Sequence, residues 1–356
     1  MSEPRSLPQP FRVLAIESSC DETGAAIVED GRVIRANVLA SSASIHARYG
    51  GVVPEIASRH QMQSLIPVLE ETLSISGLGW DDLDLVAATY GPGLAGSLLV
   101  GLTAGKALAL SRGLPFLGVN HLEAHIYASW LHTGPEGHTP ADPKLPLLAL
   151  VVSGAHTELV WIPRHGRYEL LGQTRDDAAG EAFDKVARML DLGYPGGPAI
   201  ERAAQGADPA GIALPRAWIP GTHDFSFSGL KTHVSNLLRK LEEEGHEIPT
   251  RALAAAFQDA VVDVLARKTL AAARERGARE VLLAGGVAAN LALRARLSEL
   301  LAPEGIMLRF PPVALCTDNA AMIASAAYFH ARAGERDTLD LDVRPDLTLP
   351  FAEGHA

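Results

Sequence analysis

Two triplets of short apolar stretches, each bounded by turn residues, dominate the pattern of the chain. Runs of aliphatic residues of this length predict strands. The first triplet covers residues 11–18, 24–30 and 32–39, and the second covers 147–154, 157–162 and 167–172. A helical stretch follows each triplet, so both halves of the chain begin with the same order of elements.

Each half then continues with a second shared pattern. An apolar strand leads through a glycine-containing turn into a helix at 84–97, and the same arrangement returns at 279–290. Segment 132–146 is rich in proline and glycine and is typical of a linker. The sequence therefore predicts an α/β protein built from two copies of one unit, with the glycine turns of both copies at a shared cleft.

Residues 55–75 carry apolar side chains at helical spacing. The stripe consists of Met62, Leu65, Ile66, Leu69 and Leu73. Such a stripe is typical of a helix face that packs on a core. A surface for a partner protein is the other interpretation, and the pattern alone does not separate the two.

Composition indicates a soluble globular protein. The chain has 356 residues, of which 47% are hydrophobic and 21% charged, and this length suits two lobes. No apolar run reaches the ~20 residues that span a bilayer, and residues 1–10 lack the apolar segment of a secretory signal. We expect Cys20 and Cys316 to be free thiols in a reducing cytoplasm.

The segment HLEAH places His121 and His125 four residues apart. On a helix both imidazoles leave the same face, and imidazole is the commonest protein ligand for transition metals. Asp318, in the segment TDN, offers a carboxylate as a third ligand. Two histidines and one carboxylate are typical of a catalytic metal site and suit Fe(II), Zn and Mn alike.

The same segment superficially resembles a zinc-peptidase motif, which makes a metal-dependent glycoprotein endopeptidase an alternative function. That motif needs a glutamate directly after the first histidine, to act as the base. Glu123 comes two residues after His121 and lies ~200° around a helix, so it points away from the histidine face.

Turns of small residues are candidates for contacts with a nucleotide. Segments 18–24 and 151–157 follow the first strand of each half and can offer backbone N–H groups to phosphate oxygens. Segments 193–198 and 284–290 are glycine-rich and allow close approach of a ligand. Ordinary tight turns remain an alternative explanation for each segment.

Two further segments have side chains suited to ligand binding. Asp184 lies on a predicted helix just before a glycine loop and can accept hydrogen bonds from ribose hydroxyls. Segment 225–232, FSFSGLKT, places two serines and Lys231 at a helix start, where anions are favoured.

Taken together, these segments closely resemble the tRNA N6-adenosine threonylcarbamoyltransferase family, from about residue 12 to about residue 332. The matching motifs are ESSCDETG, GGVVPEIASRHQ, GPGLAGSLLVG, VNHLEAH, VSGAHTEL, DDAAGEAFDKVAR, GYPGGP, FSFSGLKT, GGVAANLALR and CTDNAAMIA. The resemblance implies a duplicated actin-like (ribonuclease H-like) ATPase fold, with two lobes around a nucleotide cleft. We expect lobes at 11–131 and 147–316, a linker at 132–146, a C-terminal helix within 317–335 that packs back on the first lobe, and a tail at 336–356.

The resemblance also implies a reaction and a set of site residues. The threonylcarbamoyl group of threonylcarbamoyl-AMP is transferred to N6 of adenosine 37 in tRNAs that read codons beginning with A, and AMP is released. The implied metal ligands are His121, His125 and Asp318. The implied adenylate-binding residues are Val151, Val152, Ser153, Gly154, Ala155, Asp184, Gly197 and Asn290. Asp21 or Glu22 is our hypothesis for the base that removes the proton from the amine.

One position departs from the family pattern, because Ala155 stands where a second glycine is usual after Ser-Gly. A methyl group there would restrict the backbone if this residue required a positive φ. We expect one divalent metal per subunit, Fe(II) first and Zn as the alternative. A nucleotide-binding scaffold or a kinase of the same fold is the other alternative function.

The formal net charge of −11 bears on the partners that the resemblance implies. These partners are tRNA, a paralogous actin-like subunit and a small ATPase, with no membrane. Because acidic side chains outnumber basic ones by 42 to 31, contact with tRNA needs a local basic patch or a partner protein.

Overall fold

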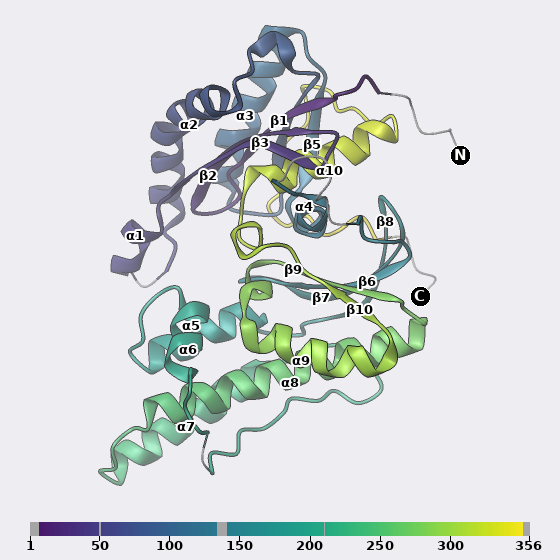
Figure 1. Ribbon diagram of the computed structural model, residues 1–356. Helices are drawn as coiled ribbons and strands as arrows, with labels where there is room; N and C mark the ends of the chain where they lie inside the picture. Colours follow the sequence, from purple (N-terminus) through teal and green to yellow (C-terminus); the bar gives the residue numbers. More distant parts are fainter. Residues whose placement is uncertain (1–6, 50, 134–140, 210, 352–356) are drawn as a thin grey trace. The chain divides into compact units, whose positions relative to one another are not determined.

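The computed structural model describes residues 7–49, 51–133, 141–209 and 211–351, which fall into two compact units (Figure 1). The first unit comprises Met1–Pro143, His165–Arg167 and Thr317–Ala356, and the second comprises Lys144–Arg164 and Tyr168–Cys316. Of the expected linker, residues 134–140 lie outside the described residues, as do residues 352–356 of the expected tail.

The first unit contains a five-stranded sheet in the order β3-β2-β1-β4-β5. Its strands are β1 (Arg12–Glu17), β2 (Glu22–Glu29), β3 (Val33–Ser41), β4 (Leu85–Gly91) and β5 (Phe116–Asn120). The hairpins β1/β2 and β2/β3 are antiparallel, whereas β1/β4 and β4/β5 are parallel. Parallel pairs bring the ends of β1, β4 and β5 to one edge of the sheet.

Helices cover both faces of this sheet. The helices of the unit are α1 (Ala43–His46), α2 (Pro54–Ser76), α3 (Ala95–Arg112), α4 (His121–Tyr127) and α10 (Ala320–Arg332), with short 3-10 helices η1 (Ala47–Tyr49), η2 (Trp80–Asp82) and η3 (Ala128–Trp130). Leu14 and Ile16 of β1 share an apolar cluster with α2 and α3. The alternate residues Val13 and Ala15 are also fully buried, on the face where α10 packs. A strand buried on both faces explains its uninterrupted apolar sequence.

The second unit repeats this topology. Its sheet has the order β10-β9-β6-β7-β8, from strands β6 (Leu147–Val152), β7 (Thr157–Arg164), β8 (Arg167–Gln173), β9 (Glu280–Ala284) and β10 (Met307–Arg309). The hairpin β6/β7 is antiparallel, like β1/β2 of the first unit. The pairs β6/β9 and β9/β10 are parallel, like β1/β4 and β4/β5. The predicted α/β class and the predicted duplication are therefore confirmed.

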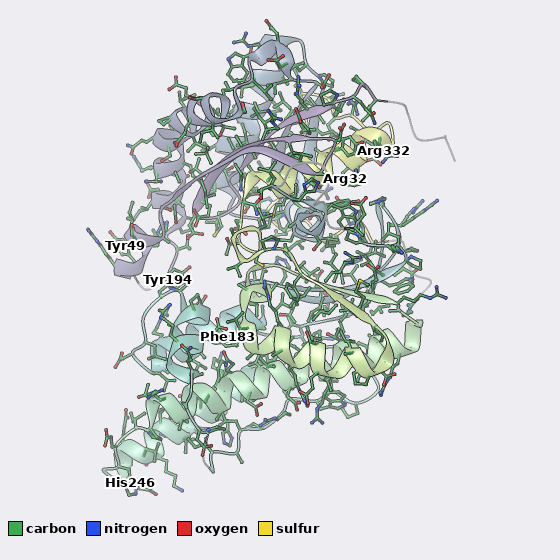
Figure 2. All side chains as sticks on the ribbon, viewed as in Figure 1. Arg32, Tyr49, Phe183, Tyr194, His246 and Arg332 are labelled. Carbon is green, nitrogen blue, oxygen red and sulfur yellow. The ribbon has the colours of Figure 1, made fainter. Side chains whose placement is uncertain are left out.

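The helices of the second unit surround its apolar core. They are α5 (Ala179–Met189), α6 (Gly196–Ala204), α7 (Ser228–Glu243), α8 (Thr250–Arg276) and α9 (Leu291–Leu301), with 3-10 helices η4 (Gly286–Ala289), η5 (Ala302–Glu304) and η6 (Val313–Leu315). Phe183 of α5, labelled in Figure 2, packs edge-to-face on Phe257 of α8 with ring centroids 5.3 Å apart. This core fixes α5, which carries Asp184.

The predicted apolar stripe on α2 divides into two sets. Leu65 and Leu69 are 5% and 3% exposed and belong to the core. Met62 and Ile66 are 70% and 60% exposed, so the core-face interpretation is wrong for these two residues. The reason is geometrical: the buried positions Gln61, Leu65, Val68, Leu69 and Thr72 form an arc that is rotated around α2 from the middle of the stripe, so Met62 and Ile66 fall outside it.

The C-terminal segment after α10 lies along β4 and β5 of the first unit. Asp337 accepts a hydrogen bond from the Gly118 N–H, the Arg344 N–H donates to the Tyr90 carbonyl oxygen, and Lys106 Nζ donates to the Leu341 carbonyl oxygen. Asn120 Nδ2 donates to the Thr348 carbonyl oxygen at 2.8 Å, at the start of α4. The tail is thus part of the first unit.

Two expectations from composition can be compared with the structure. Cys20 and Cys316 are both free thiols, as predicted. None of the helices in the described residues combines the length and the apolar character that crossing a bilayer demands.

Candidate metal centre and adenylate-binding residues

His121 and His125 lie on α4, a helix of seven residues that begins directly at the end of β5. Asn120 caps this helix, because its Oδ1 accepts hydrogen bonds from the N–H groups of Leu122 and Glu123. The two imidazole rings stand at 80° to one another with centroids 4.7 Å apart. The cap and the four-residue spacing therefore place both rings on one face of α4, as the sequence predicted.

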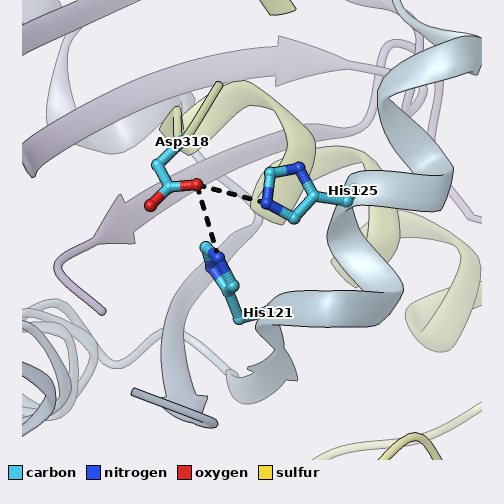
Figure 3. Close-up of side chains that lie close together, drawn as sticks. All are labelled: His121, His125 and Asp318. Carbon is cyan, nitrogen blue, oxygen red and sulfur yellow. Dashed lines mark ion pairs between the residues drawn. The ribbon is translucent and has the colours of Figure 1, made fainter. Parts of the chain in front are cut away.

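Asp318 completes a cluster with the two histidines (Figure 3). Its Oδ1 lies 3.4 Å from His121 Nε2 and 3.2 Å from His125 Nε2. Asp318 directly precedes Asn319, which caps α10 by accepting from the Met322 N–H. One ligand atom from each of the three side chains lies within 4.8 Å of the others, and no other group of this kind occurs within the described ranges.

The donor set fits a metal ion. His125 is 1% exposed, yet neither of its ring nitrogens has a hydrogen-bond partner among the described residues. A buried polar atom without a partner costs free energy. A metal ion bound by both His125 Nε2 and Asp318 Oδ1 would remove this cost. Two imidazole nitrogens and a carboxylate oxygen suit the divalent metals Fe(II), Zn and Mn.

Glu17, at the end of β1, orients one of the ligands and was not identified from the sequence. Its fully buried carboxylate lies 3.1 Å from His121 Nδ1 and accepts a hydrogen bond from Thr89 Oγ1 at 2.6 Å. A carboxylate on Nδ1 leaves Nε2 of the same ring for a metal. An acidic residue closing an otherwise apolar strand was the signal in the sequence.

The charges of the cluster are strongly interdependent. Burial alone would lower the pKa of His121, but the carboxylates of Glu17 and Asp318 outweigh it and raise the pKa well above the usual value. Burial alone would raise the pKa of Asp318, but the two histidines outweigh it and lower the pKa. The site therefore favours positive charge between its carboxylates, which a proton or a metal cation can provide.

The candidate bases Asp21 and Glu22 lie at the β1/β2 turn. Gln61 of α2 holds this turn, since its Nε2 lies within hydrogen-bonding distance of the carbonyl oxygens of Ser18, Cys20 and Glu22. Ser41 Oγ donates to one oxygen of Glu22 at 2.8 Å. Burial raises the pKa of Glu22 to about 7 despite this bond, with smaller contributions from Asp21 and Asp318. A carboxyl group with this pKa suits proton transfer near neutral pH.

The predicted adenylate loop, Val151–Ala155, runs from the end of β6 into the β6/β7 turn. Gly180 at the start of α5 packs closely under it, because a Cβ there would lie 2.5 Å from the Ser153 carbonyl oxygen. Ala155 is exposed, and its φ is not positive: of the non-glycine residues that the structure describes, only Asp30 and Asp191 have positive φ. The alanine is therefore compatible with the loop conformation.

Asp184 and Gly197 lie at the junction between α5 and α6. Asp184 Oδ1 accepts a hydrogen bond from the Gly196 N–H at 2.7 Å. A Cβ at Gly196 would lie 2.4 Å from the Asp184 Cα, whereas a Cβ at Gly197 would meet no atom within 4 Å. Gly196 is therefore required by packing, and Gly197 leaves space above the backbone.

Asn290 caps α9. Its Oδ1 accepts from the Leu293 N–H and its Nδ2 donates to Gln258 Oε1, both at 2.9 Å. These two bonds use the oxygen and the nitrogen of the amide. An N-cap at this position is also expected from the sequence, because asparagine directly before a helix is a favoured cap.

The predicted anion position at the start of α7 is occupied by the chain itself. Asp176 accepts hydrogen bonds from the N–H groups of Phe227 and Ser228 and from the hydroxyl groups of Ser226 and Ser228. Lys231 pairs with Asp177 at 2.7 Å. The helix start does favour an anion, as predicted, and a carboxylate of the chain itself takes that position.

Glu123 does not take the position of a peptidase base. Its side chain is 2% exposed and its Oε2 lies 2.8 Å from His330 Nε2, on the side of α4 away from the histidine face. The endopeptidase alternative thus lacks the base that its motif requires.

Comparison with known proteins decides the family. A model of the family described as "tRNA N6-adenosine threonylcarbamoyltransferase" matches residues 33–325. The chain belongs to this family. A threonylcarbamoyltransferase of Thermomicrobium roseum is 52% identical over 95% of this chain and 96% of its own length, and one of Dehalococcoides mccartyi is 53% identical over 95% and 99%. Membership in the threonylcarbamoyltransferase family makes the chain an enzyme of the transferase class, as the resemblance implied.

Solved structures support the fold that the resemblance implied for a threonylcarbamoyltransferase. Component A of (R)-2-hydroxyglutaryl-CoA dehydratase from Acidaminococcus fermentans matches 90% of this chain and 99% of its own chain, with a TM-score of 0.50 and 16% identity. Full-length HypF matches 93% of this chain and 57% of its own, with a TM-score of 0.57 and 14% identity. The two-lobed, actin-like ATPase fold is therefore confirmed.

Proposed function

We propose that the chain transfers the threonylcarbamoyl group of threonylcarbamoyl-AMP to N6 of adenosine 37 in tRNAs that read codons beginning with A. Membership of the family, with 52–53% identity to enzymes of that name over 95% of the chain, is the observation that carries this proposal. The nucleoside, the atom and the transferred group are those in the name of the family. The adenylate donor, the tRNA position and the codon class are the further content of the proposal.

The reaction forms a bond between N6 and the carbamoyl carbon and breaks the bond between that carbon and the phosphate oxygen of AMP. The amine loses a proton in the process, and AMP leaves with the electron pair. Conjugation with the purine ring makes this amine a weak nucleophile, so orientation and charge stabilisation must supply much of the rate. Glu22 or Asp21 would accept the proton. The pKa of Glu22, about 7, is suited to this role.

His121, His125 and Asp318 would hold one divalent metal, Fe(II) first and Zn as the alternative. Such a metal, when bound, supplies Lewis acid polarisation of oxygen atoms of the threonylcarbamoyl group. Glu17 would keep His121 in the tautomer that presents Nε2. All four side chains belong to the first unit.

Residues of the second unit would bind the adenylate: the 151–155 loop, Asp184, Gly197 and Asn290. The backbone of the loop can donate to phosphate oxygens. The Asp184 carboxylate, which accepts from the Gly196 N–H at the start of α6, would also accept a hydrogen bond from a ribose hydroxyl. The space above Gly197 allows the nucleotide to lie against the backbone.

A single-turnover assay tests the reaction and the metal ligands together. Anaerobically purified protein is mixed with the adenylate, a tRNA transcript and Fe(II), and modified adenosine is measured after nuclease digestion. We expect His121→Ala and His125→Ala to lose the metal and nearly all transfer while remaining folded. His246→Ala serves as the matched control, because His246 is an exposed histidine in the loop after α7. This variant should keep both the metal and the transfer activity. Full transfer by a metal-free His121→Ala protein would contradict the proposal.

We also propose that sustained turnover in the cytoplasm requires a paralogous actin-like subunit and a small ATPase. The excess of acidic over basic side chains repels tRNA at long range, so a partner would have to supply part of the tRNA-binding surface. Met62 and Ile66, exposed on α2, are the candidate docking surface for the paralogue. Multiple-turnover modification by this chain alone, given only adenylate and metal, would show that no partner is needed.

A further inference from the structure

The acidic residue between the two histidines of α4 makes a buried contact with α10. Glu123 Oε2 lies 2.8 Å from His330 Nε2, and the Glu123 side chain is 2% exposed. The other ring nitrogen of His330 lies 2.6 Å from Glu335 Oε2, and Glu335 is largely exposed. A single imidazole thus joins one buried and one exposed carboxylate.

This contact means that α10 holds α4 on two sides. Asp318, next to the N-cap of α10, faces His121 and His125, whereas His330, near the other end of α10, faces Glu123. Glu123 leaves α4 ~200° around the axis from either histidine. A rotation of α4 that moved the histidines would therefore also break the contact between Glu123 and His330.

Such a constraint matters because α4 has only seven residues. Helices shorter than ~12–15 residues are marginal by themselves, so tertiary contacts must set the position of α4. Tyr127 stacks on Phe329 with ring centroids 4.9 Å apart, and this contact holds the last residue of α4 rather than its middle. The bond from His330 to Glu123 is directional and fixes the rotation.

The pKa of His330 reflects its contacts with the two carboxylates. Burial alone would lower the pKa of His330, but Glu123 and Glu335 outweigh it and raise the pKa well above its usual value. A buried ion pair contributes little net stability, because desolvation of its charges offsets their attraction. Fixing the relative placement of two elements is the better-attested use of such a pair.

We propose that Glu123 and His330 are positioning residues that set the rotation of α4 and thereby the spacing of His121, His125 and Asp318. This inference rests on the metal centre proposed above. Neither residue contacts substrate or metal in this role. Under this proposal the central glutamate of HLEAH positions the helix, whereas in a zinc peptidase the glutamate of the motif is the catalytic base.

Binding of Co(II) by the full chain, followed by titration and by ligand-field absorption, tests the proposal. We expect Glu123→Ala to bind Co(II) ~10–100-fold more weakly, as removal of outer-shell partners does, and to show altered absorption bands. Glu123→Gln keeps an acceptor for His330 and should recover most of the affinity. Glu335→Ala removes the exposed contact of the same imidazole, leaves α4 joined to α10, and should resemble the wild type.

Each other outcome is also informative. If Glu123→Ala binds Co(II) with wild-type affinity and spectrum, the positioning role is wrong and the metal centre stands. If the wild type binds no Co(II), the metal centre itself is wrong. If Glu123→Ala does not fold, His330→Leu replaces it, and the same weakening is expected. If neither variant folds, the pair is a general stabilising contact and the proposal is overturned.

Discussion

At the scale of the residue, three carboxylates of the sequence motifs bond to other parts of the chain. Glu17 holds His121 Nδ1, Asp176 caps α7, and Glu123 reaches α10. Sequence motifs mark such residues without separating them from residues that contact a ligand. Burial and hydrogen-bond partners distinguish the two kinds of residue. Glu22 is the candidate base whose pKa burial raises to about 7.

The raised pKa of Glu22 predicts a pH-dependent stability difference. The group has its usual pKa of ~4.3 in the unfolded chain, so its contribution to stability is fully present below that pH and is lost as pH rises through about 7. In metal-free protein, Glu22→Gln should therefore raise the melting temperature relative to wild type more at pH 8 than at pH 5. Equal differences at both pH values would show that Glu22 is not buried as described.

Two adjacent glycines should respond differently to the same substitution. Gly197→Val should leave thermal stability near that of wild type, because no atom lies within 4 Å of a Cβ there, and should abolish adenylate binding. Gly196→Val should destabilise the protein by more than ~1 kcal/mol, because its side chain would collide with the backbone of Asp184. Calorimetric titration with a non-reactive adenylate analogue and thermal melts measure both effects. Normal binding by Gly197→Val would place the nucleotide elsewhere.

At the scale of the element, α2 serves two surfaces. Its buried side packs on β2 and β3 through residues such as Leu65 and Leu69, and its exposed side presents Met62 and Ile66. Gln61, on the same helix, holds the turn that carries the candidate bases. Side chains on this one helix thus belong to the core, to the proposed docking surface and to the support of the β1/β2 turn.

Glutamate substitutions on α2 separate the core from the docking surface. Leu69→Glu should lower the free energy of unfolding by several kcal/mol, because it buries an unpaired charge. Met62→Glu should change stability by no more than ~0.5 kcal/mol, since the side chain is exposed, and should weaken binding of the paralogous subunit. Melting curves and a pull-down with that subunit give the two readouts. Undiminished binding by Met62→Glu would exclude Met62 from the docking surface.

At the scale of the whole molecule, one architecture occurs twice with different site residues. The first copy holds the candidate metal centre, at the start of α4 and just before α10, and the second holds the loop after β6 and the caps of α6 and α9. The first unit also combines both ends of the sequence, because α10 and the C-terminal segment complete it.

Removal of the C-terminal segment tests whether this segment stabilises the first unit. A chain ending at Arg336 keeps Glu335 but loses the hydrogen bonds made by Asp337, Leu341, Arg344 and Thr348. Several bonds of ~0.5–1.5 kcal/mol each are lost, so we expect a clearly lower melting temperature of the first unit and weaker Co(II) binding, since Asn120 caps α4. A chain ending at Phe351 keeps these bonds and is the control. An unchanged melting curve for the shorter chain would contradict the prediction.

The sequence by itself determined the α/β class and the duplication, and it predicted the three side chains that form the candidate metal centre of the first unit. Apolar periodicity, turn residues and helical spacing are local properties, and they are sufficient to predict strands, their order and the shared face of His121 and His125. The sequence also led to the family, through motifs that extend over most of the chain.

Only the tertiary structure decided which partner each polar or apolar side chain meets. It brought Glu17 to His121, Glu123 to His330 and Asp176 to α7, across separations of 104, 207 and about 50 residues. It also divided the stripe of α2 into buried and exposed residues. The physical reason is that burial and pairing depend on elements that are distant in sequence, whereas periodicity records only which side chains share a face.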